Sequence, residues 1–398
     1  MIGPFATLAL ATLLGGAVEP GARGGGDEVD LTAPRTTQRR VDASKVAVFG
    51  LKWREPVVQT GFFRTVGDSF GRPAISTRHG LVIVGTGEGV VRAVSLALGR
   101  PVWAYTHGAP FEASPTVVDG PNGVEMVVIA SRDGRLLALS SADGKLLWKV
   151  ELGAESRAVA VAAGDLLLVA TAANRIAALE ISSGKPVWNA GRPGPTGLTV
   201  VGHARPLVVG DTVIGAFSDG YVEAYARKDG TRRWSRPLSL RGADFVDADA
   251  DPVGKGGRVF VASYSDGVYA LDLKTGEPAW NRPAPAVKSL ALIGDTLVAG
   301  SGDGWVWGLA ADDGTPRYRT RVSHGLVTRM EAARGLVAFG GGDAGLVVLD
   351  GRTGRPLQAS NYGSRMHGDP VWVRDDLVLL SSFGYLYCFG YGHRGRVQ

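Results

Sequence analysis

Three aspartates at alternating positions, Asp247, Asp249 and Asp251, have a spacing that suggests a metal site. Alternating carboxylates can surround a hard cation such as Ca²⁺, which prefers several oxygen ligands. An EF-hand loop also needs glycine at its sixth position and glutamate at its twelfth. This stretch has Pro252 and Arg258 there. It therefore favours an acidic loop that faces solvent or a partner protein over a calcium site.

Other residue types that support catalysis lack the arrangement that such chemistry requires. No two of the six histidines are spaced as metal ligands on a helix would be. The sole cysteine, Cys388, excludes an intramolecular disulfide and a cysteine-rich metal site. Its place in the run YLYCF predicts a small core residue. We therefore predict that the protein is not an enzyme.

The composition indicates a large protein built from short strands. The chain has 398 residues, of which 45% are hydrophobic and 58 are glycine. Glycine in excess without a collagen-like period is typical of many tight turns. The net charge of +5 is mild, and the Lys and Arg residues are scattered along the chain. This charge distribution argues against a nucleic-acid-binding protein.

A repeat runs along almost the whole chain and can be aligned on a glycine followed four residues later by an aromatic residue. The pairs are Gly99 and Trp103, Gly144 and Trp148, Gly184 and Trp188, Gly230 and Trp234, Gly276 and Trp280, and Gly314 and Tyr318. A seventh copy keeps Gly354 but has Gln358 in place of the ring. Successive glycines are 38 to 46 residues apart.

Each copy holds short β-rich runs separated by turn signals. Four strands in about 40 to 45 residues is the period of a β-propeller blade, with the aromatic residue on the outermost strand. The last copy, from Pro370 to Phe389, has only three strands, and LKWRE around Trp53 supplies the fourth. We predict an all-β fold over residues 45–394: an eight-bladed β-propeller of four-stranded blades, closed by pairing of the N- and C-terminal strands.

The N-terminal region has a different character. Residues Phe5 to Leu14 form a ten-residue apolar run followed by small residues, which predicts a signal peptide over residues 1–18. Residues 19–44 are rich in Gly, Arg, Asp and Thr, which predicts a flexible tether. The later sequence has no apolar run long enough for a transmembrane helix.

Charged residues recur where the innermost strands are expected to begin. They are Arg72, Arg157, Arg205, Lys288 and Arg329, with Asp251 and Asp369 among them. In a propeller these positions gather near the mouth of the central channel. The sequence predicts either a ring of mutually paired charges there or a mainly basic ring that receives an acidic peptide or a small anion.

The blade sequence SDGVYALDLKTGEPAW at residues 265–280 resembles the repeat of PQQ-like (quinoprotein-type) propellers. Just before it, FVDADADPV is similar to the Asp-Val-Asp-x-x-Pro signature of the BamB family, with Asp247, Asp249 and Pro252 at the matching positions. The resemblance implies an exported, non-catalytic scaffold for the assembly and insertion of β-barrel proteins into the outer membrane. Its implied partner is the periplasmic part of a BamA-like barrel-inserting protein.

The same resemblance implies a protein-binding site. It comprises the two aspartates Asp247 and Asp249 together with Leu198 and Val200. The latter two are the apolar positions of GLTVVGHARP, which is similar to the family's Leu-x-Leu-Arg loop. Val201 stands where that loop has its arginine.

A further departure from the family concerns membrane attachment. The family's signal peptide ends in a cysteine that carries lipid, whereas this sequence has Ala17 at that position and no lipobox cysteine. The sequence as given implies a monomer within a complex in the periplasm, peripheral to the inner face of the outer membrane.

Two alternative functions are compatible with a propeller of this repeat class. One is a PQQ-dependent quinoprotein dehydrogenase. Many of these enzymes stack the quinone on a ring formed by adjacent cysteines, which a chain with a single cysteine does not have. The other is a ligand-binding propeller of another envelope complex. We predict no cofactor, no metal and no catalytic residues.

Overall fold

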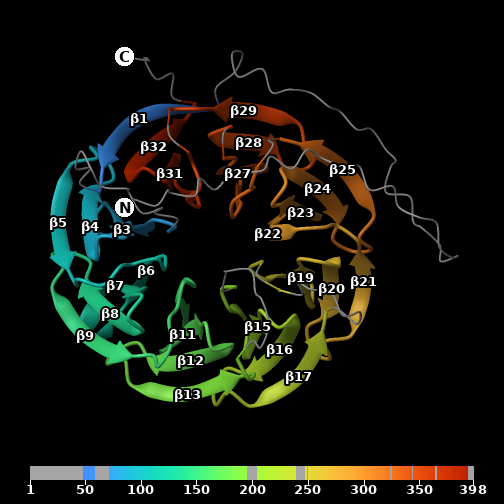
Figure 1. Cartoon of the computed structure of the whole chain (residues 1–398), viewed down its shortest axis with the longest axis horizontal. Helices are drawn as coiled ribbons and strands as arrows, with labels where there is room; N and C mark the ends of the chain where they lie inside the picture. The colour runs from blue at the N-terminus through green and yellow to red at the C-terminus, as the bar shows by residue number, and fades with distance from the viewer. Residues whose placement is uncertain are drawn as a thin grey trace, which may run out of the picture. The chain divides into compact units, whose positions relative to one another are not determined.

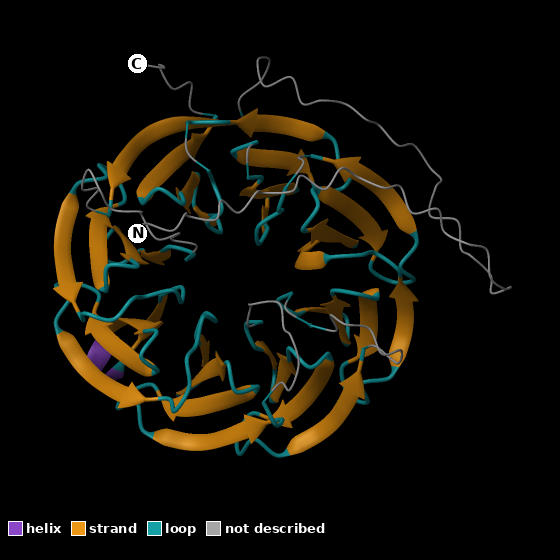
Figure 2. Cartoon of the chain, viewed as in Figure 1, coloured by secondary structure: helices purple, strands orange, loops and turns teal. Residues whose placement is uncertain are grey.

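The computed structural model describes residues 48–58, 71–194, 204–238, 247–248, 250–322, 325–342, 344–363 and 365–392. Within these ranges the strands form eight four-stranded antiparallel sheets arranged as a ring, which confirms the predicted eight-bladed β-propeller (Figure 1). Figure 2 shows that the described secondary structure is almost entirely strand. The predicted signal peptide and tether lie outside the described residues and remain predictions.

Blades 1 to 4 follow one another along the chain, and each runs from the inner to the outer edge of the ring. Blade 1 comprises β2 Ala74–Ser76, β3 Leu81–Gly85, β4 Val90–Ser95 and β5 Pro101–Thr106. Blade 2 comprises β6 Thr116–Asp119, β7 Glu125–Ala130, β8 Arg135–Ser140 and β9 Leu146–Glu151, with the 3₁₀ helix Pro121–Gly123 between its first two strands. Blade 3 comprises β10 Val161–Ala163, β11 Leu166–Thr171, β12 Arg175–Glu180 and β13 Pro186–Gly191. Blade 4 comprises β14 Leu207–Val209, β15 Thr212–Ala216, β16 Tyr221–Ala226 and β17 Arg232–Pro237.

Blades 5 to 7 repeat this order, and blade 8 joins the two ends of the chain. Blade 5 comprises β18 Val253–Lys255, β19 Arg258–Ser263, β20 Gly267–Asp272 and β21 Pro278–Arg282. Blade 6 comprises β22 Val287–Ile293, β23 Thr296–Ser301, β24 Trp305–Ala310 and β25 Pro316–Arg321. Blade 7 comprises β26 Glu331–Ala333, β27 Leu336–Gly340, β28 Leu346–Asp350 and β29 Pro356–Ser360. Blade 8 comprises β30 Val371–Val373, β31 Asp376–Leu380, β32 Tyr385–Tyr391 and β1 Phe49–Pro56.

The hydrophobic core is divided among the eight junctions between adjacent blades. Each junction holds one cluster of buried side chains drawn from the two blades that meet there. The second strands are therefore apolar on both faces; every residue of β7, for example, is buried. Cys388 is fully buried at the junction of blades 8 and 1, as the sequence predicted for a small core residue.

The repeating glycine and aromatic residue of one blade do not contact each other; each contacts its counterpart in a neighbouring blade. A Cβ atom added to Gly184 in blade 3 would lie 2.7 Å from the ring of Trp148 in blade 2. Gly184 also has φ +71°, a conformation that favours glycine. The indole Nε1 of Trp148 donates to the backbone oxygen of Ile181, just before this turn, at 3.1 Å. The aromatic residue thus locks each outer strand onto the next blade.

Ring closure follows this rule on one side and departs from it on the other. Strand β1 pairs with β32 as predicted (Figure 1), and Trp53 covers Gly99 of blade 1. At the junction of blades 7 and 8, Gln358 is buried and replaces the ring. Its Nε2 donates to the Phe49 oxygen at 2.9 Å, and the Phe49 nitrogen donates to its Oε1 at 2.7 Å. The third and fourth strands of blade 8 come from opposite ends of the chain, so no turn glycine joins them there.

Candidate functional site

The acidic stretch that follows blade 4 crosses to blade 5 and is held by backbone hydrogen bonds to both. The Ala248 nitrogen donates to the Phe217 oxygen of blade 4 at 3.2 Å, and the Tyr264 nitrogen of blade 5 donates to the Asp247 oxygen at 2.9 Å. The side chain of Asp247 is almost fully buried, with 1% of the residue exposed. Asp247 therefore contributes to the blade junction itself. Asp249, Leu198 and Val200 lie outside the described residues.

Asp251, the third aspartate of the stretch, joins three blades near the start of the inner strands. Its Oδ1 accepts a hydrogen bond from the Arg205 nitrogen at 2.7 Å. Its Oδ2 lies 3.2 Å from Nε of Arg329 and 3.6 Å from Nε of Arg205. Because Arg205 precedes blade 4 and Arg329 precedes blade 7, this buried carboxylate stabilises the ring across the channel mouth. Removing one partner of such a buried group is costly.

The remaining charges at the inner strands are also largely paired. Arg329 reaches Asp369 at 3.3 Å, and burial raises the pKa of that carboxyl above its ordinary value. Other pairs are Arg72 with Glu331 at 2.9 Å, and Arg157 with Glu112 at 2.9 Å and Glu155 at 2.7 Å. Of the two arrangements that the sequence allowed, the structure is nearer to the mutually paired ring, although Lys288 lies 5.5 Å from the centroid of the Tyr264 ring instead of in an ion pair with another described residue.

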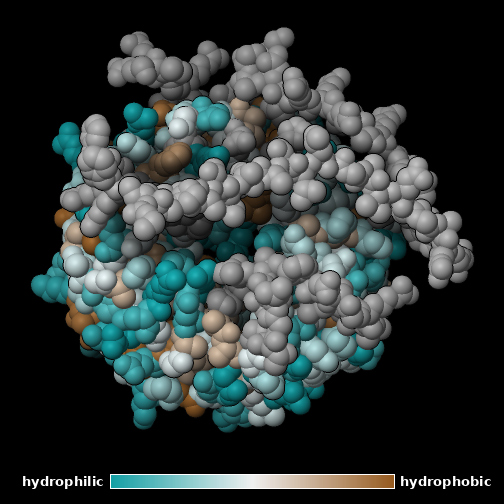
Figure 3. Space-filling model, viewed as in Figure 1, coloured by the Kyte–Doolittle hydropathy of each residue, from teal (hydrophilic) through white to brown (hydrophobic). Residues whose placement is uncertain are grey.

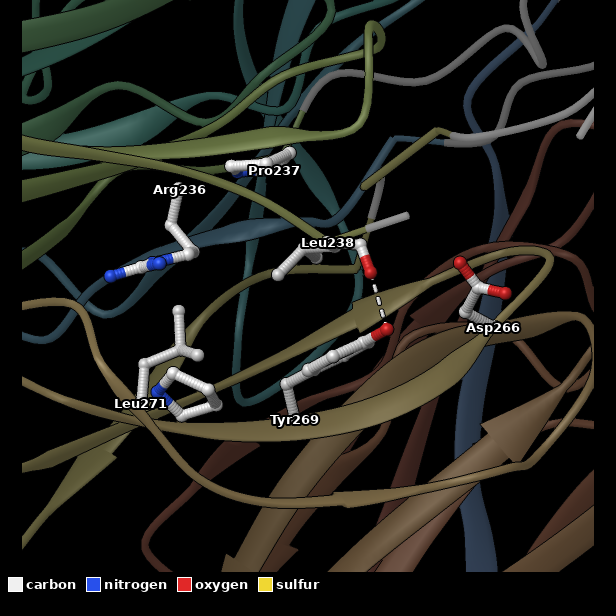
Figure 4. A pocket seen from close by; sticks show the side chains of 7 residues that line it. Arg236, Pro237, Leu238, Asp266, Tyr269 and Leu271 are labelled. Atoms are coloured by element: carbon white, nitrogen blue, oxygen red, sulfur yellow. Dashed lines mark hydrogen bonds between the residues drawn. The ribbon is translucent and has the colours of Figure 1, made fainter. Parts of the chain in front are cut away.

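A cavity of about 270 Å³ lies at the junction of blades 4 and 5 (Figure 4). It is lined by Arg236, Pro237, Leu238, Asp266, Tyr269, Leu271 and Pro278. The Tyr269 hydroxyl donates to the Leu238 oxygen, and burial raises the pKa of Tyr269 to about 12. The phenol is therefore neutral near pH 7, and its ring and the leucine side chains give the cavity an apolar lining.

Arg236, the basic residue of this cavity, is held in place by blade 5. Arg236 donates from Nε to the Gly276 oxygen at 3.0 Å, and its NH2 donates to the Glu277 carboxylate. Leu238, which lies beside Tyr269 in Figure 4, is the last described residue before the acidic stretch. The cavity thus suits an apolar side chain of a docking protein more than a charged small molecule.

The described residues hold no group of three or more potential metal ligands. Within those same ranges, no helix is long and apolar enough to cross a membrane. Of the four residues predicted for protein binding, the structure describes only Asp247, and it places that side chain in the interior.

Sequence reasoning did not find the cavity. Its walls come from β17, β20 and β21 and from the connections that hold Leu238 and Asp266, which belong to two consecutive blades. One available signal was Pro237-Leu238, an apolar pair that follows Arg236 and lies nine residues before Asp247.

Comparisons with known proteins agree on one family. The family model described as "Outer membrane protein assembly factor BamB" matches residues 87–318. The BamB protein of Shewanella oneidensis is 23% identical over 339 residues, which cover 81% of this chain and 85% of that protein. The BamB protein of Xanthomonas campestris is 29% identical over 258 residues, which cover 62% of this chain and 63% of that protein.

Solved structures show the same fold. The crystal structure of BamB from Moraxella catarrhalis matches with a TM-score of 0.74 and 22% identity, covering 86% of this chain and 100% of that chain. Saccharomyces cerevisiae Sqt1 matches with a TM-score of 0.67 and 11% identity, covering 82% of this chain and 97% of that chain. At these identities the structural matches support the propeller fold alone.

Proposed function

We propose that this chain, which belongs to the BamB family of outer membrane protein assembly factors, is a non-catalytic scaffold for the assembly and insertion of β-barrel proteins into the outer membrane. The observation that carries the proposal is the family match, which extends over residues 87–318 and so from blade 1 to blade 6. A rigid ring of this kind contributes to assembly by holding loops in fixed positions for a partner.

The docking surface that we propose comprises the two connections that flank blade 4 in the sequence, one before β14 and one after β17. Asp249 is its acidic contact residue, and Leu198 and Val200 are its apolar contact residues. Asp247 belongs to the same group, and its burial supports a role in holding the loop between the blades. The adjacent cavity around Tyr269 would receive an apolar side chain of the partner.

The partner that we propose is the periplasmic region of a BamA-like barrel-inserting protein, and the compartment is the periplasm at the inner face of the outer membrane. The names of the relatives support this assignment, because all those reported above are outer membrane protein assembly factors. None of these relatives is named as an enzyme, so they give no support to the quinoprotein alternative.

A binding experiment with purified proteins tests the docking surface. The periplasmic domains of the barrel-inserting protein are immobilised, and the wild-type ring is compared with Asp249→Ala and Leu198→Ala. We expect each substitution to weaken capture. Glu151→Ala is the matched control, because its carboxylate is exposed on blade 2, away from the proposed surface.

Asp247 requires a separate readout. Since its side chain is buried, Asp247→Asn reports on loop position, and its thermal stability is measured beside its affinity. Equal capture by wild-type protein, Asp249→Ala and Leu198→Ala would exclude the proposed surface. Absorbance changes on addition of pyrroloquinoline quinone and Ca²⁺ would instead favour the enzyme alternative.

A further inference from the structure

Every outer strand contains a β-bulge at the residue just before the aromatic position. In blade 1, Ala93 pairs with Trp103 and Val94 pairs with Pro101, so Val102 has no partner in the ladder. The same irregularity leaves Leu147 unpaired in β9 and Val187 unpaired in β13. A bulge of this kind bends the edge strand and turns the extra residue outward.

Three other blades place an ion-paired basic residue at the same position. These pairs are Arg233 with Asp211 at 2.5 Å in blade 4, Arg317 with Asp295 at 2.7 Å in blade 6, and Lys52 with Asp376 at 2.9 Å in blade 8. The fold therefore accepts a charge at the bulge. Charges are also a common protection of exposed sheet edges against pairing with another chain.

Blades 1 to 3 carry exposed apolar side chains instead. Leu98 is 63% exposed, Val102 53%, Leu146 42%, Leu147 44% and Val187 45%. We call these five residues the apolar rim. They account for five of the eight large hydrophobic residues that are exposed in the part of the chain that the structure describes. Figure 3 shows hydrophobic side chains along the left edge of the molecule, where Figure 1 places β5 and β9.

The outer strands that carry the apolar rim are linked from blade to blade by the aromatic contacts. The half-buried ring of Trp103 in blade 1 covers Gly144, two residues before Leu146 of blade 2. The half-buried ring of Trp148 in turn covers Gly184, three residues before Val187 of blade 3. Clustered exposed apolar residues on a soluble protein mark interaction sites.

The outer strands also present unpaired backbone groups. Strands β5, β9 and β13 each stand last in their four-stranded sheets, so no described strand pairs with their outer edges. Arg100 and Lys185 follow the turn glycines of blades 1 and 3, are exposed, and have no ion pair among the described residues. The rim thus combines apolar side chains, free strand edges and unpaired positive charge.

We propose that the apolar rim binds an extended polypeptide segment in which apolar side chains alternate with polar and acidic ones. The proposal rests on the proposed function, because the strands of membrane β-barrels have this alternation before they are folded. Apolar side chains of the segment would pack beside Val102, Leu147 and Val187. Its carboxylates would pair with Arg100 and Lys185.

The curvature of the rim favours an extended polypeptide over a flat lipid bilayer as the ligand. Eight blades share a full circle, so adjacent blades differ in direction by about 45°, and β5 and β13 differ by about 90°. A bilayer could touch one or two of the three blades at a time. A flexible extended chain follows the curve and contacts all three.

Fluorescence anisotropy with a defined probe tests the proposal. The probe is a labelled ten-residue peptide in which valine and tyrosine alternate with threonine and aspartate. Its control has the same composition with the apolar residues in one block. We expect the wild-type ring to bind the alternating peptide more tightly than the block peptide.

The test variant carries Val102→Lys, Leu147→Lys and Val187→Lys, which gives blades 1 to 3 the charge that blades 4, 6 and 8 already have. We expect it to bind the peptide roughly tenfold more weakly or worse. Ala279→Lys, at the bulge of blade 5, is the matched control, because Ala279 is exposed at the same position outside the rim. It should bind as the wild type does, and circular dichroism should show both variants folded.

Three outcomes would overturn the proposal: no binding of the peptide by the wild-type ring, equal binding by the triple variant, or no preference for the alternating sequence. Flotation with anionic phospholipid vesicles that depends on the rim would assign it to a membrane. A dimer in light scattering that the triple variant abolishes would assign the rim to a second copy of the chain.

Capture of the barrel-inserting protein's domains is measured in parallel. The triple variant should retain it, so failure of the rim and failure of the proposed function are distinguishable.

Discussion

Seven junctions between blades are built from an aromatic ring over a turn glycine, and the eighth is built from a carboxamide. At the junction of blades 2 and 3, Trp148 covers Gly184 and donates one hydrogen bond to the backbone. At the junction of blades 7 and 8, Gln358 exchanges two hydrogen bonds with the backbone of Phe49. Both arrangements bury the end of an outer strand. The first depends on the buried area and shape of the aromatic ring, and the second depends on hydrogen bonds that satisfy the backbone groups of Phe49.

The repeat loses its aromatic residue at the one junction where the next blade has no turn glycine. The aromatic residue of each blade needs the turn between the third and fourth strands of the next blade. Blade 8 has no such turn, because its fourth strand β1 comes from the N-terminal end of the described chain. Without that turn, the first residue of β1 exposes backbone groups that need partners. Gln358 supplies both a donor and an acceptor.

The largest expected effect comes from forcing the rule on the exception. Gln358→Trp restores the repeat pattern but leaves the backbone nitrogen and oxygen of Phe49 without partners. Each buried group left in this state costs about 1–3 kcal/mol. It also adds a large ring where no turn glycine makes room. We expect the free energy of unfolding to fall by about 3 kcal/mol or more in urea denaturation.

The matched control lies one junction earlier. Tyr318→Trp places the same ring over Gly354, where a turn glycine is present, and should cost less than about 1.5 kcal/mol. Equal or greater stability of Gln358→Trp would mean that the junction does not depend on the carboxamide.

A smaller effect is expected at an ordinary junction. Trp148→Ala removes a half-buried ring and should lower the free energy of unfolding by about 2–3 kcal/mol, less than the range for fully buried rings. Gly184→Ala should also be destabilising, because its Cβ would lie 2.7 Å from the ring at φ +71°.

Combining the two changes sharpens this prediction. In the Trp148→Ala background the clash is gone and only the backbone cost of about 1–2 kcal/mol remains. The double-mutant cycle should therefore show a coupling of about 1 kcal/mol. Strict additivity would mean that ring and glycine are not in contact.

The repeat made the fold predictable, because a glycine recurs every 38 to 46 residues in seven copies and an aromatic residue follows it at a fixed distance in six of them. Trp53 was recognised as the missing aromatic because it stands in a lone strand-like run outside the copies. The role of Gln358 was not predictable, because its partner Phe49 is 309 positions away. The local sequence shows that the aromatic side chain is missing at this position, but only the closed propeller shows that Gln358 and Phe49 take over its role.

The candidate site was less accessible to sequence reasoning. Asp247 looks like an exposed acid, because alternating aspartates favour solvated loops. Its burial follows from backbone hydrogen bonds to two different blades, through Phe217 and Tyr264. The cavity around Tyr269 likewise exists only because blades 4 and 5 pack side by side.

The smallest expected effect is a pH dependence of the stability, which we assign to Glu223 at the junction of blades 3 and 4. Burial alone would raise the pKa of Glu223, but hydrogen bonds from Tyr225, Ser235 and Arg192 lower it below its ordinary value of 4.5. A depressed pKa in the folded state contributes stability above about pH 4.5 that is lost as pH falls through the folded-state value. Unfolding midpoints measured from pH 7 to pH 3 should therefore decrease below about pH 4.5.

Glu223→Gln is the control for this dependence. It should be less stable than the wild type at pH 7 and should show a flatter pH profile. A wild-type profile parallel to that of Glu223→Gln would exclude Glu223 as the titrating group. The contact between Trp148 and Gly184 involves no ionisable side chain, so it should not contribute to the slope.

One measurement separates the role of the blades, which build the propeller, from the role of the acidic stretch, which we propose binds the partner. Isothermal titration of the wild-type ring with the periplasmic domains of the barrel-inserting protein gives the reference affinity. Asp249→Ala should weaken it roughly tenfold with an unchanged unfolding midpoint, whereas Trp148→Ala should lower the midpoint and leave the affinity of the folded protein unchanged. Binding that is absent in the wild type, or unchanged in Asp249→Ala, would contradict the account.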